Sequence, residues 1–545
     1  RADALLYDAI VAGDLSKLRT RVQAEARPML APPLAWHKPV DGTLPMGGEY
    51  HVDTTLVRTN SRRHMAILAG MPCSDYQPVL DGLNALSATP WRVNERVLRI
   101  VEYMWEAQPD GLTFVADTPS SVSVPQMPDL SGLEEEEADK ARRTYMEELR
   151  YAMRRRQNLH SQRASTRLKL DVAHDFLGET FYFPHNLDFR GRAYAVGPHL
   201  QYLGDDLARG LLSFAEAKPL GHNGLFWLKV QLANLYGMDK LSLDDRAAWS
   251  DEQVASGIIG TINAHPIGAE AIEWWSKAEN PLQTLALCLE LDEAVSSDAP
   301  EDFLSRCPVH ADGSCNGLQH YAALGRDLVG ASQVNLVPGD KPADIYSGVR
   351  EVVEKRVHEQ ATATLPTLDE FMEQIESEHA EKERAEEEEA LASRAAEEMA
   401  GLVKKRSRRA KKSTPPTPAE IERRHYAMVE QQRLAKLLDT HISRKVVKQT
   451  VMTTVYGVTA LGAKQQILNR LEEVHEADGF NGPVERRDLP KMATYIAGLT
   501  LSSLGENFKG ATESMAWLLK VARLISHESN MPVEWVTPLG WPVVQ

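Results

Sequence analysis

Residues 308–327 constrain the fold of this chain more than any other stretch. A short apolar segment leads to Asp312, the residues Gly-Ser-Cys-Asn-Gly follow, and apolar residues then recur at helical spacing. This pattern predicts a strand-to-helix corner at Asp312 and a helix that begins near Asn316. A carboxylate held between two rigid elements suits a hard cation, because Gly313 and Gly317 let backbone groups approach a bound ion closely. The alternative interpretation is that Asp312 only caps the helix.

The same stretch contains four soft ligands at the spacing of a zinc knuckle, which are Cys307, His310, Cys315 and His320. A knuckle is a small closed loop of its own, whereas His320 falls well inside the predicted helix of a large domain. We therefore interpret the four as core and turn residues.

A second informative stretch carries two cations and a phenol. On a helix, Arg444 and Lys448 lie one turn apart on one face, and Tyr456 lies near that face two turns further on. Lys448 offers a point charge for a triphosphate, Arg444 offers a fork for phosphate oxygens, and Tyr456 beside Gly457 offers a ring and a hydroxyl to a sugar or base. Such a row is also typical of a solvated basic face. Combined with Asp312, it indicates the two halves of a nucleotidyl-transfer site.

The third stretch, residues 188–194, reads Asp-Phe-Arg-Gly-Arg-Ala-Tyr. On a strand, Arg190, Arg192 and Tyr194 alternate so that all three point to one side. Two cations and a ring suit template phosphates and a stacked base. The alternative is a structural Arg-Asp pair within a turn.

These stretches resemble the motifs of the single-subunit, bacteriophage-type DNA-directed RNA polymerases, and most closely those of the mitochondrial members. The run from Asp312 to His320 is similar to the first catalytic-aspartate motif of the family, and Lys448-x7-Tyr-Gly is similar to its nucleotide-binding fingers helix. The segment around Arg190 is similar to the palm segment that contacts template. The likeness extends through shorter motifs at residues 91–94, 274–275 and 535–540. Residues 533–545 read as a hairpin, and we interpret Trp227, Trp274 and Trp275 as core aromatics.

The resemblance implies an α+β, predominantly helical right-hand polymerase fold, in which a small antiparallel palm sheet carries Asp312. The implied activity is DNA-templated transfer of ribonucleoside triphosphates to an RNA 3′ end, assisted by two Mg²⁺ ions. Asp312 would bind metal through its carboxylate, with the carbonyl of Gly313 as a further ligand. Arg444 and Lys448 would hold the triphosphate, and Tyr456 would sense the sugar.

The resemblance also implies a division into domains. We expect the C-terminal part of an N-terminal domain at residues 1–110, a thumb at 111–178, a palm at 179–330 with a helical insertion at about 221–300, and fingers at 331–545. Residues 133–177 read as a helix whose acidic start gives way to many arginines, which favours a contact surface for nucleic-acid phosphates.

One segment departs from the family pattern. Residues 361–436 are first rich in glutamate, then rich in lysine and arginine, and then rich in proline. Opposite charges in such a segment can pair or remain solvated, and proline ends a helix. We therefore expect a charged, low-complexity insert that is partly helical and lies on the surface.

Composition limits the partners. The net charge of -16 argues against a protein that coats nucleic acid through its overall field, so basic residues must be concentrated locally. No apolar run approaches the roughly 18 residues of a membrane span. The resemblance implies a DNA template, an RNA transcript, ribonucleoside triphosphates and organellar transcription factors as partners, with no membrane, in a mitochondrion or alternatively a plastid.

Two other functions fit parts of the pattern. A related family A DNA polymerase shares the Arg-x3-Lys-x7-Tyr-Gly helix, but its first-aspartate motif carries a steric-gate glutamate where this chain has small residues that leave room for a 2′-hydroxyl. A non-catalytic nucleic-acid-binding scaffold is the other alternative, and Mg²⁺-dependent nucleotide binding would distinguish it. In the resembled family the second catalytic aspartate lies far downstream of a Thr-Pro-Leu-Gly segment. Because the sequence ends at Gln545, soon after Thr537, we expect residues 1–545 alone to be inactive.

Overall fold

A computed structural model describes residues 26–39, 44–50, 54–107, 118–132, 134–311, 313, 315–399, 416–439, 441–476, 480 and 484–545. The chain divides into two compact units. Unit 1 comprises Arg1–Asp312 and Ala522–Gln545, and unit 2 comprises Gly313–Val521. The predicted thumb, palm and fingers boundaries stay predictions.

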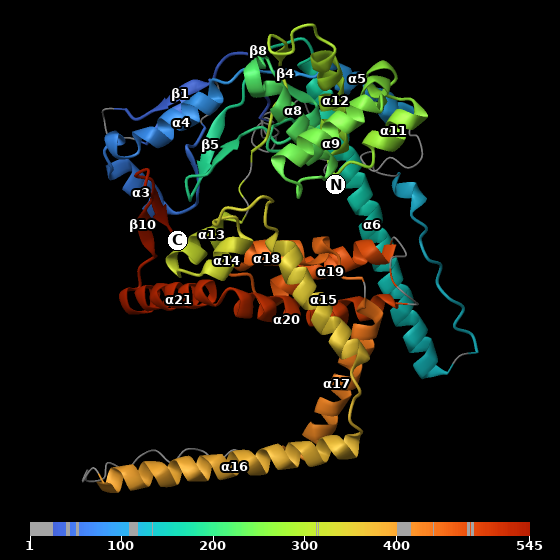
Figure 1. Cartoon of the computed structure of the whole chain (residues 1–545), viewed down its shortest axis with the longest axis vertical. Coiled ribbons are helices and arrows are strands. Elements are labelled where there is room, and N and C mark those ends of the chain that lie inside the picture. Colours follow the sequence, from blue (N-terminus) through green and yellow to red (C-terminus); the bar gives the residue numbers. More distant parts are fainter. Residues whose placement is uncertain are drawn as a thin grey trace, which may run out of the picture. The chain divides into compact units, whose positions relative to one another are not determined.

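Unit 1 is built from helices and short paired strands (Figure 1). Its helices are α3 (Arg62–Gly70), α4 (Gln77–Ser87), α5 (Glu95–Ala107), α6 (Glu135–Asp175), α7 (Asp206–Gly210), α8 (Gly221–Tyr236), α9 (Leu243–Ala255), α10 (Ile258–Ala264), α11 (Ala269–Trp275) and α12 (Pro281–Val295). Its strands are β1 (Leu34–His37), β2 (Met46–Gly48), β3 (Val57–Arg58), β4 (Trp91–Val93), β5 (His185–Asp188), β6 (Ala193–Ala195), β7 (Leu212–Phe214), β8 (Lys218–Pro219), β9 (Leu304–Ser305), β10 (Glu534–Val536) and β11 (Pro542–Val544).

The strands form small sheets, ordered β1-β2, β3-β5-β6, β4-β7, β8-β9 and β10-β11. All described pairs are antiparallel except β3 with β5. The hairpin predicted at the C-terminal end of the sequence is confirmed as β10 and β11. The predicted class, predominantly helical with small antiparallel sheets, is confirmed for the part of the chain that the structure describes.

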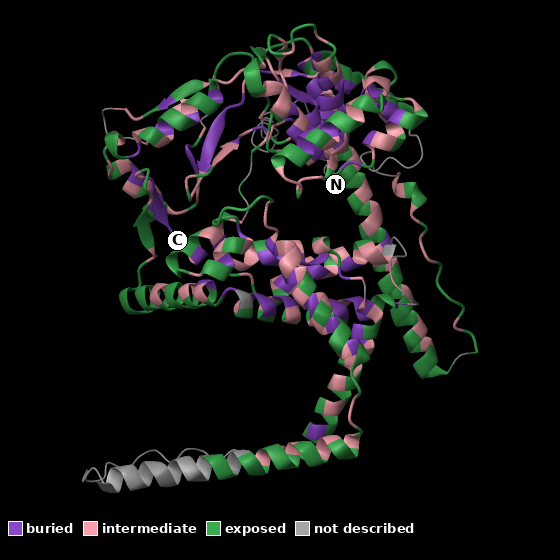
Figure 2. Cartoon of the chain, in the orientation of Figure 1, coloured by how far each residue is buried: buried purple, intermediate pink, exposed green. Residues whose placement is uncertain are grey.

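The main core of unit 1 lies around α12, which is apolar on nearly every side and therefore packs on every side. Figure 2 shows this region as the largest buried area of the unit. Trp275 is fully buried and Trp274 packs against the core, as predicted. The prediction that Trp227 is a core residue is wrong, because 47% of its surface is exposed on α8.

Helix α6 confirms the helix predicted at residues 133–177. Its buried residues are concentrated in the C-terminal part, where it packs against α5 and where Arg163 lies 4.5 Å from the ring centroid of Trp105. Along the N-terminal half most side chains are exposed, including Arg142, Arg143 and Arg150. None of the helices in the described ranges combines the length and the apolar content that a bilayer crossing requires.

A buried histidine joins strand β5 to helix α4 and to the turn that contains Tyr202. His185 is fully buried; its Nδ1 lies 3.1 Å from Ser87 Oγ and its Nε2 lies 2.8 Å from Tyr202 Oη. Burial lowers the pKa of His185 to about 4, because the charged imidazolium would lose its hydration.

This burial predicts a pH-dependent stability. The pKa of His185 in the folded state lies below the value of about 6.5 that histidine has in an unfolded chain. The stability that the neutral His185 ring contributes is therefore complete above pH 6.5 and is lost as the pH falls towards 4. Between pH 7 and pH 5 we expect the protein to lose about 2 kcal/mol more unfolding free energy than His185→Gln does. Denaturant unfolding at both pH values measures this. His265→Gln, which removes an exposed histidine, should keep the pH dependence of the unmodified protein.

Unit 2 is helical (Figure 1). Its helices are α13 (Asn316–Leu324), α14 (Leu328–Gln333), α15 (Ile345–Thr362), α16 (Leu368–Met399), α17 (Pro418–Leu438), α18 (Arg444–Thr454), α19 (Ala460–Glu476), α20 (Leu489–Asn507) and the first part of α21 (Lys509–Ser529). On α15, Val349, Val353 and Val357 recur every fourth residue and are buried in a core shared with α17, α18, α19 and α20.

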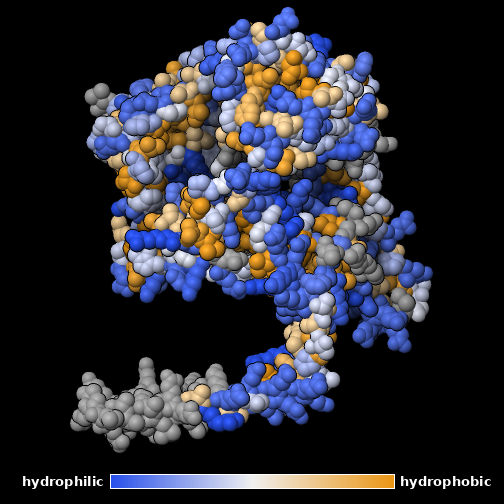
Figure 3. Space-filling view, viewed as in Figure 1, coloured by the Kyte–Doolittle hydropathy of each residue, from blue (hydrophilic) through white to orange (hydrophobic). Residues whose placement is uncertain are grey.

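The charged insert is helical on both sides of its undescribed middle. The prediction of a partly helical segment is confirmed by α16 and α17, and Figure 3 shows mainly hydrophilic surface along the described part of α16. Its predicted boundaries are wrong, because Ala361, Ile421 and Leu434 are buried and Arg433 donates to both carboxylate oxygens of Asp488. The ends of the segment therefore belong to the core of unit 2.

Removing residues 378–414, the middle of the insert, should have little effect on stability. We expect replacement of residues 378–414 by a short Gly/Ser linker to change the Tm by less than about 2 °C, because loop closure costs little extra free energy as a loop changes length. Replacement of residues 361–436 should lower the Tm by more than about 10 °C, because it removes buried side chains. Thermal unfolding of both variants tests this, and equal Tm values for the two would contradict it.

Candidate active site

The first predicted motif is described only in part. Asp312 and Ser314 lie outside the described residues, so the structure does not place the predicted metal-binding carboxylate. Helix α13 begins at Asn316, as predicted, and its N-cap residue is Cys315 in the left-handed conformation (φ 52°). The preceding strand, β9, ends at Ser305, so residues 306–311 form an irregular connection between strand and motif.

Cys315 contacts a tyrosine that sequence reasoning missed. Its Sγ lies 2.7 Å from the hydroxyl of Tyr346, in the first turn of α15. Burial raises the pKa of Tyr346 and, with Asp344 nearby, that of Cys315, so both groups remain protonated at neutral pH. One of the four residues at zinc-knuckle spacing therefore directs its sulfur to a phenol. No group of three His, Cys, Asp or Glu side chains that could hold a metal occurs among the described residues.

Arg444 lies beside the same tyrosine and pairs with Asp344. Its Nε and Nη2 donate to the two carboxylate oxygens at 2.7 and 3.2 Å, and the Asp344 side chain is only 12% exposed. Asp344 is also the N-cap residue of α15, accepting from the backbone N–H of Tyr346 and the hydroxyl of Ser347. The guanidinium carbon of Arg444 is 4.9 Å from the ring centroid of Tyr346. This pair therefore fixes where α18 begins relative to α15.

Lys448 lies one helical turn further on, also over the Tyr346 ring. Its Nζ is 5.9 Å from the ring centroid, which confirms that Arg444 and Lys448 share one face of α18. Within the described ranges Lys448 forms no ion pair, whereas Arg444 does. The N-cap aspartate two residues before Tyr346 was the signal that could have found this start of a helix.

The end of α18 packs directly against the start of α13. A Cβ atom on Gly317 would lie 2.9 Å from Cγ2 of Val455, closer than two carbon atoms can pack. A side chain at Gly317 would push the helices apart. The start of α13 and the end of α18, well over a hundred residues apart in the sequence, thus meet through this contact.

Tyr456 does not continue the helix, so its predicted place on the helical face is wrong. Helix α18 ends at Thr454, and Tyr456 lies in a turn closed by Gly457, whose φ is +77°. The backbone N–H of Tyr456 donates to Thr453. Its side chain is 61% exposed. The turn frees the ring from the helix and presents it at the surface of unit 2.

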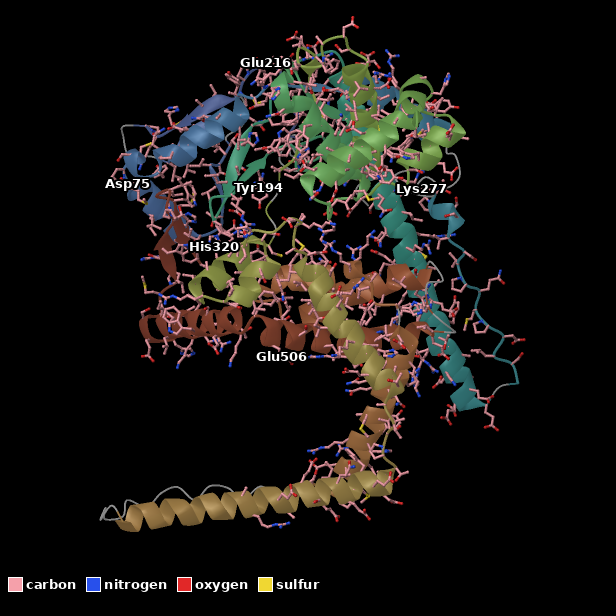
Figure 4. The ribbon with its side chains drawn as sticks, viewed as in Figure 1. Asp75, Tyr194, Glu216, Lys277, His320 and Glu506 are labelled. Carbon is pink, nitrogen blue, oxygen red and sulfur yellow. The ribbon has the colours of Figure 1, made fainter. Side chains whose placement is uncertain are left out.

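The third predicted motif is a hairpin turn and not a continuous strand. Strand β5 ends at Asp188 and β6 begins at Ala193, so only Tyr194 of the three predicted residues lies on a strand (Figure 4). Asp188 accepts from the backbone N–H groups of Arg190 and Arg192, and the Arg190 guanidinium donates to its other oxygen at 2.8 and 3.0 Å. The prediction of strand alternation is therefore wrong, and the Arg-Asp turn pair is present. These hydrogen bonds lower the pKa of Asp188 despite its partial burial.

Comparison with known proteins identifies the family. Residues 218–545 match the DNA-dependent RNA polymerase family. The chain is 38% identical over 544 residues to the chloroplastic DNA-directed RNA polymerase 3B of Nicotiana tabacum, covering 99% of this chain and 47% of that protein. It is 38% identical over 542 residues to the chloroplastic/mitochondrial DNA-directed RNA polymerase 2 of Arabidopsis thaliana, covering 99% of this chain and 45% of that protein. It is 38% identical over 549 residues to the mitochondrial DNA-directed RNA polymerase 1B of Nicotiana tabacum, covering 100% of this chain and 46% of that protein.

A match over more than half of its residues defines the class: the chain belongs to the DNA-dependent RNA polymerase family. It spans about half the length of the curated relatives it matches. Membership agrees with the predicted polymerase fold and does not favour the family A DNA polymerase alternative.

Proposed function

We propose that the protein is a DNA-directed RNA polymerase that adds ribonucleoside triphosphates to an RNA 3′ end under the direction of a DNA template. The observation that carries the proposal is the packing of Gly317 against Val455, which brings the helix that follows the aspartate motif to the end of the helix that carries Lys448. Family membership of the chain supports the same activity.

The proposal assigns divalent metal binding to Asp312 and to the carbonyl of Gly313. These oxygen donors fit Mg²⁺ chemically. Gly313 also has open space beside it, since a Cβ there would meet no atom within 4 Å. Two bound Mg²⁺ ions would polarise the phosphate and stabilise the leaving pyrophosphate.

The cations of α18 have separate roles in the proposal. Lys448 neutralises the triphosphate. We assign it this role because its ammonium group makes no ion pair with any described residue. Arg444 holds Tyr346 in place through Asp344 and supplies positive charge to the same triphosphate. Gly457 gives Tyr456 the turn from which its hydroxyl reads the sugar.

The nucleic-acid partners in the proposal are a DNA template and an RNA transcript. Arg190, Arg192 and Tyr194 contact the template from the β5–β6 hairpin, and the exposed arginines of α6 contact phosphates. In domain terms, residues 111–178 are the thumb, 179–330 the palm and 331–545 the fingers. The site of action is an organelle, by analogy with the relatives, and we propose the mitochondrion, with organellar transcription factors as partners. A plastid is the alternative.

Templated extension of an RNA primer tests the function. With Mg²⁺ and four ribonucleotides, the full-length protein that contains residues 1–545 should make a product that follows the template sequence, and a chelator should abolish it. Preferential use of deoxyribonucleotides would instead indicate a DNA polymerase. Template binding with neither extension nor metal-dependent nucleotide binding would indicate a scaffold.

Tyr456→Phe should change sugar selection more than it changes rate. If the phenol hydroxyl reads the 2′ position, its loss should raise deoxyribonucleotide incorporation relative to ribonucleotide incorporation about tenfold, the effect of one hydrogen bond to a polar group. Competition between the two sugars on one template measures the ratio. Since the side chain is mostly exposed, the Tm should not change, and an unchanged ratio would remove this role from Tyr456.

A further inference from the structure

Trp541 connects the C-terminal hairpin to the turn that carries Arg190 and Arg192. Its side chain is 1% exposed, in the core formed with α3, α4 and β5. Its indole Nε1 donates to the backbone carbonyl of Phe189 at 3.3 Å. Phe189 is the first residue of the turn between β5 and β6, so this bond holds the turn where it leaves the sheet.

The indole also lies against the middle of the same turn. Gly191 has a φ of +86°, and a Cβ built on it would lie 2.9 Å from Cδ1 of Trp541. Only glycine satisfies both the backbone conformation and the approach of the ring. Arg190 and Arg192 flank Gly191, and Asp188 binds both of their backbone N–H groups. The turn is therefore held by the hydrogen bonds of Asp188 and by its packing against Trp541.

Two rings and a close backbone approach by the preceding residue also hold Trp541. The rings of His64 and Tyr76 meet the indole edge-on, with centroid distances of 5.9 and 6.1 Å. Gly540, with a φ of +80°, passes so close to Asp75 that a Cβ there would overlap the Asp75 carbonyl. A shift of the buried indole would disturb these contacts as well.

We propose that Trp541 is a positioning residue: it fixes the Asp188–Arg192 turn so that Arg190 and Arg192 face the template phosphates in a defined geometry. The consequence for template binding rests on the proposed function. The contact between Trp541 and the turn, here called the lock, does not. Residues from the C-terminal hairpin thereby control a template contact that lies about 350 residues away in the sequence.

A pair of glycine substitutions isolates the contact. Gly191→Ala adds a methyl group against Trp541, whereas Gly178→Ala adds one at nearly the same φ, +82°, with nothing within 4 Å. Both carry similar backbone strain, but only Gly191→Ala places it, and a contact with Trp541, within the turn. Trp541→Leu leaves Gly191 unchanged and therefore tests the contact without that strain. Trp541→Leu removes the ring and the N–H donor, and Trp541→Phe keeps an aromatic ring in the same core.

Each variant is compared with the unmodified protein by two measurements. Hydrogen–deuterium exchange of a peptide that contains residues 185–195 reports the order of the turn without any nucleic acid. Fluorescence anisotropy with a labelled DNA template strand, at several salt concentrations, reports binding. For Gly191→Ala and Trp541→Leu we expect exchange in the turn to be at least tenfold faster, DNA affinity to fall about tenfold and the salt slope to decrease by about 2, one for each misplaced arginine. Gly178→Ala should match the unmodified protein in all three, and Trp541→Phe should stay within about threefold.

Hydrogen–deuterium exchange and DNA binding test two different claims: that Trp541 orders the turn, and that the turn binds template. If the unmodified protein fails to bind template DNA, the template assignment fails, while exchange in the turn still tests the lock. If Gly191→Ala and Trp541→Leu leave both the exchange and the salt slope at the values of Gly178→Ala, Trp541 is only a core residue and the inference is overturned.

Discussion

Asp312→Asn, made in the full-length protein that contains this chain, should reduce templated extension by about a hundredfold or more while template binding remains nearly unchanged. The substitution keeps the size and polarity of the side chain but removes the negative charge that the proposed metal ions need. Electrostatic stabilisation of a developing charge is commonly the largest single contribution to such a rate, so losing a ligand affects the chemical step and not the encounter with DNA.

Primer extension and DNA anisotropy on the same preparation separate these effects. Asp340→Asn is a matched control, because it makes the same change of charge at an exposed position of unit 2. It should extend RNA at the unmodified rate. Extension by Asp312→Asn within a few-fold of that rate would exclude Asp312 as a metal ligand and would undo the assignment of the motif.

Lys448→Ala and Arg444→Ala should fail in different ways, although both remove a cation from one face of α18. Lys448 makes no ion pair with any described residue, so its loss should raise the KM for ribonucleotides about 10- to 100-fold, the effect of one charge-assisted hydrogen bond to phosphate. Its Tm should change by no more than about 2 °C.

Arg444→Ala should instead reduce stability as well as activity. It leaves the carboxylate of Asp344, 12% exposed, without its guanidinium partner, and it loosens Tyr346 beside Lys448. We expect a loss of about 2 kcal/mol of unfolding free energy. Denaturant unfolding and nucleotide titration of both variants test the separation, with the exposed neighbour Lys445→Ala as control. An equal loss of stability in both variants would show that Lys448 also has a structural partner.

Local patterns in the sequence were sufficient for much of the fold. The bounds of α6, the start of α13 at Asn316 and the β10–β11 hairpin were all predictable. Each depends on residues within a few positions of one another: helical spacing of apolar residues, a glycine-rich turn, or a short turn between two apolar runs. The pairing of Arg444 with Lys448 on one face follows from the same short-range geometry.

Sequence reasoning failed where contacts between distant segments decided the outcome. Tyr346 lies about a hundred residues before Lys448, so no local pattern shows that its ring underlies both cations. Helix α18 ends before Tyr456 because the turn at Gly457 takes over the backbone hydrogen bonds there. The wrong boundaries of the charged insert have the same cause, since Leu434 is buried by helices from elsewhere in unit 2.

The sequence by itself therefore determined the family, the helical class and the kinds of residue that the site uses. Only the tertiary structure decided which of those residues are engaged with one another: Arg190 with Asp188, Arg444 with Asp344, and Trp541 with Gly191. The physical reason is range. Backbone conformation depends on neighbours along the chain, whereas burial and charge pairing depend on which distant surfaces exclude water together.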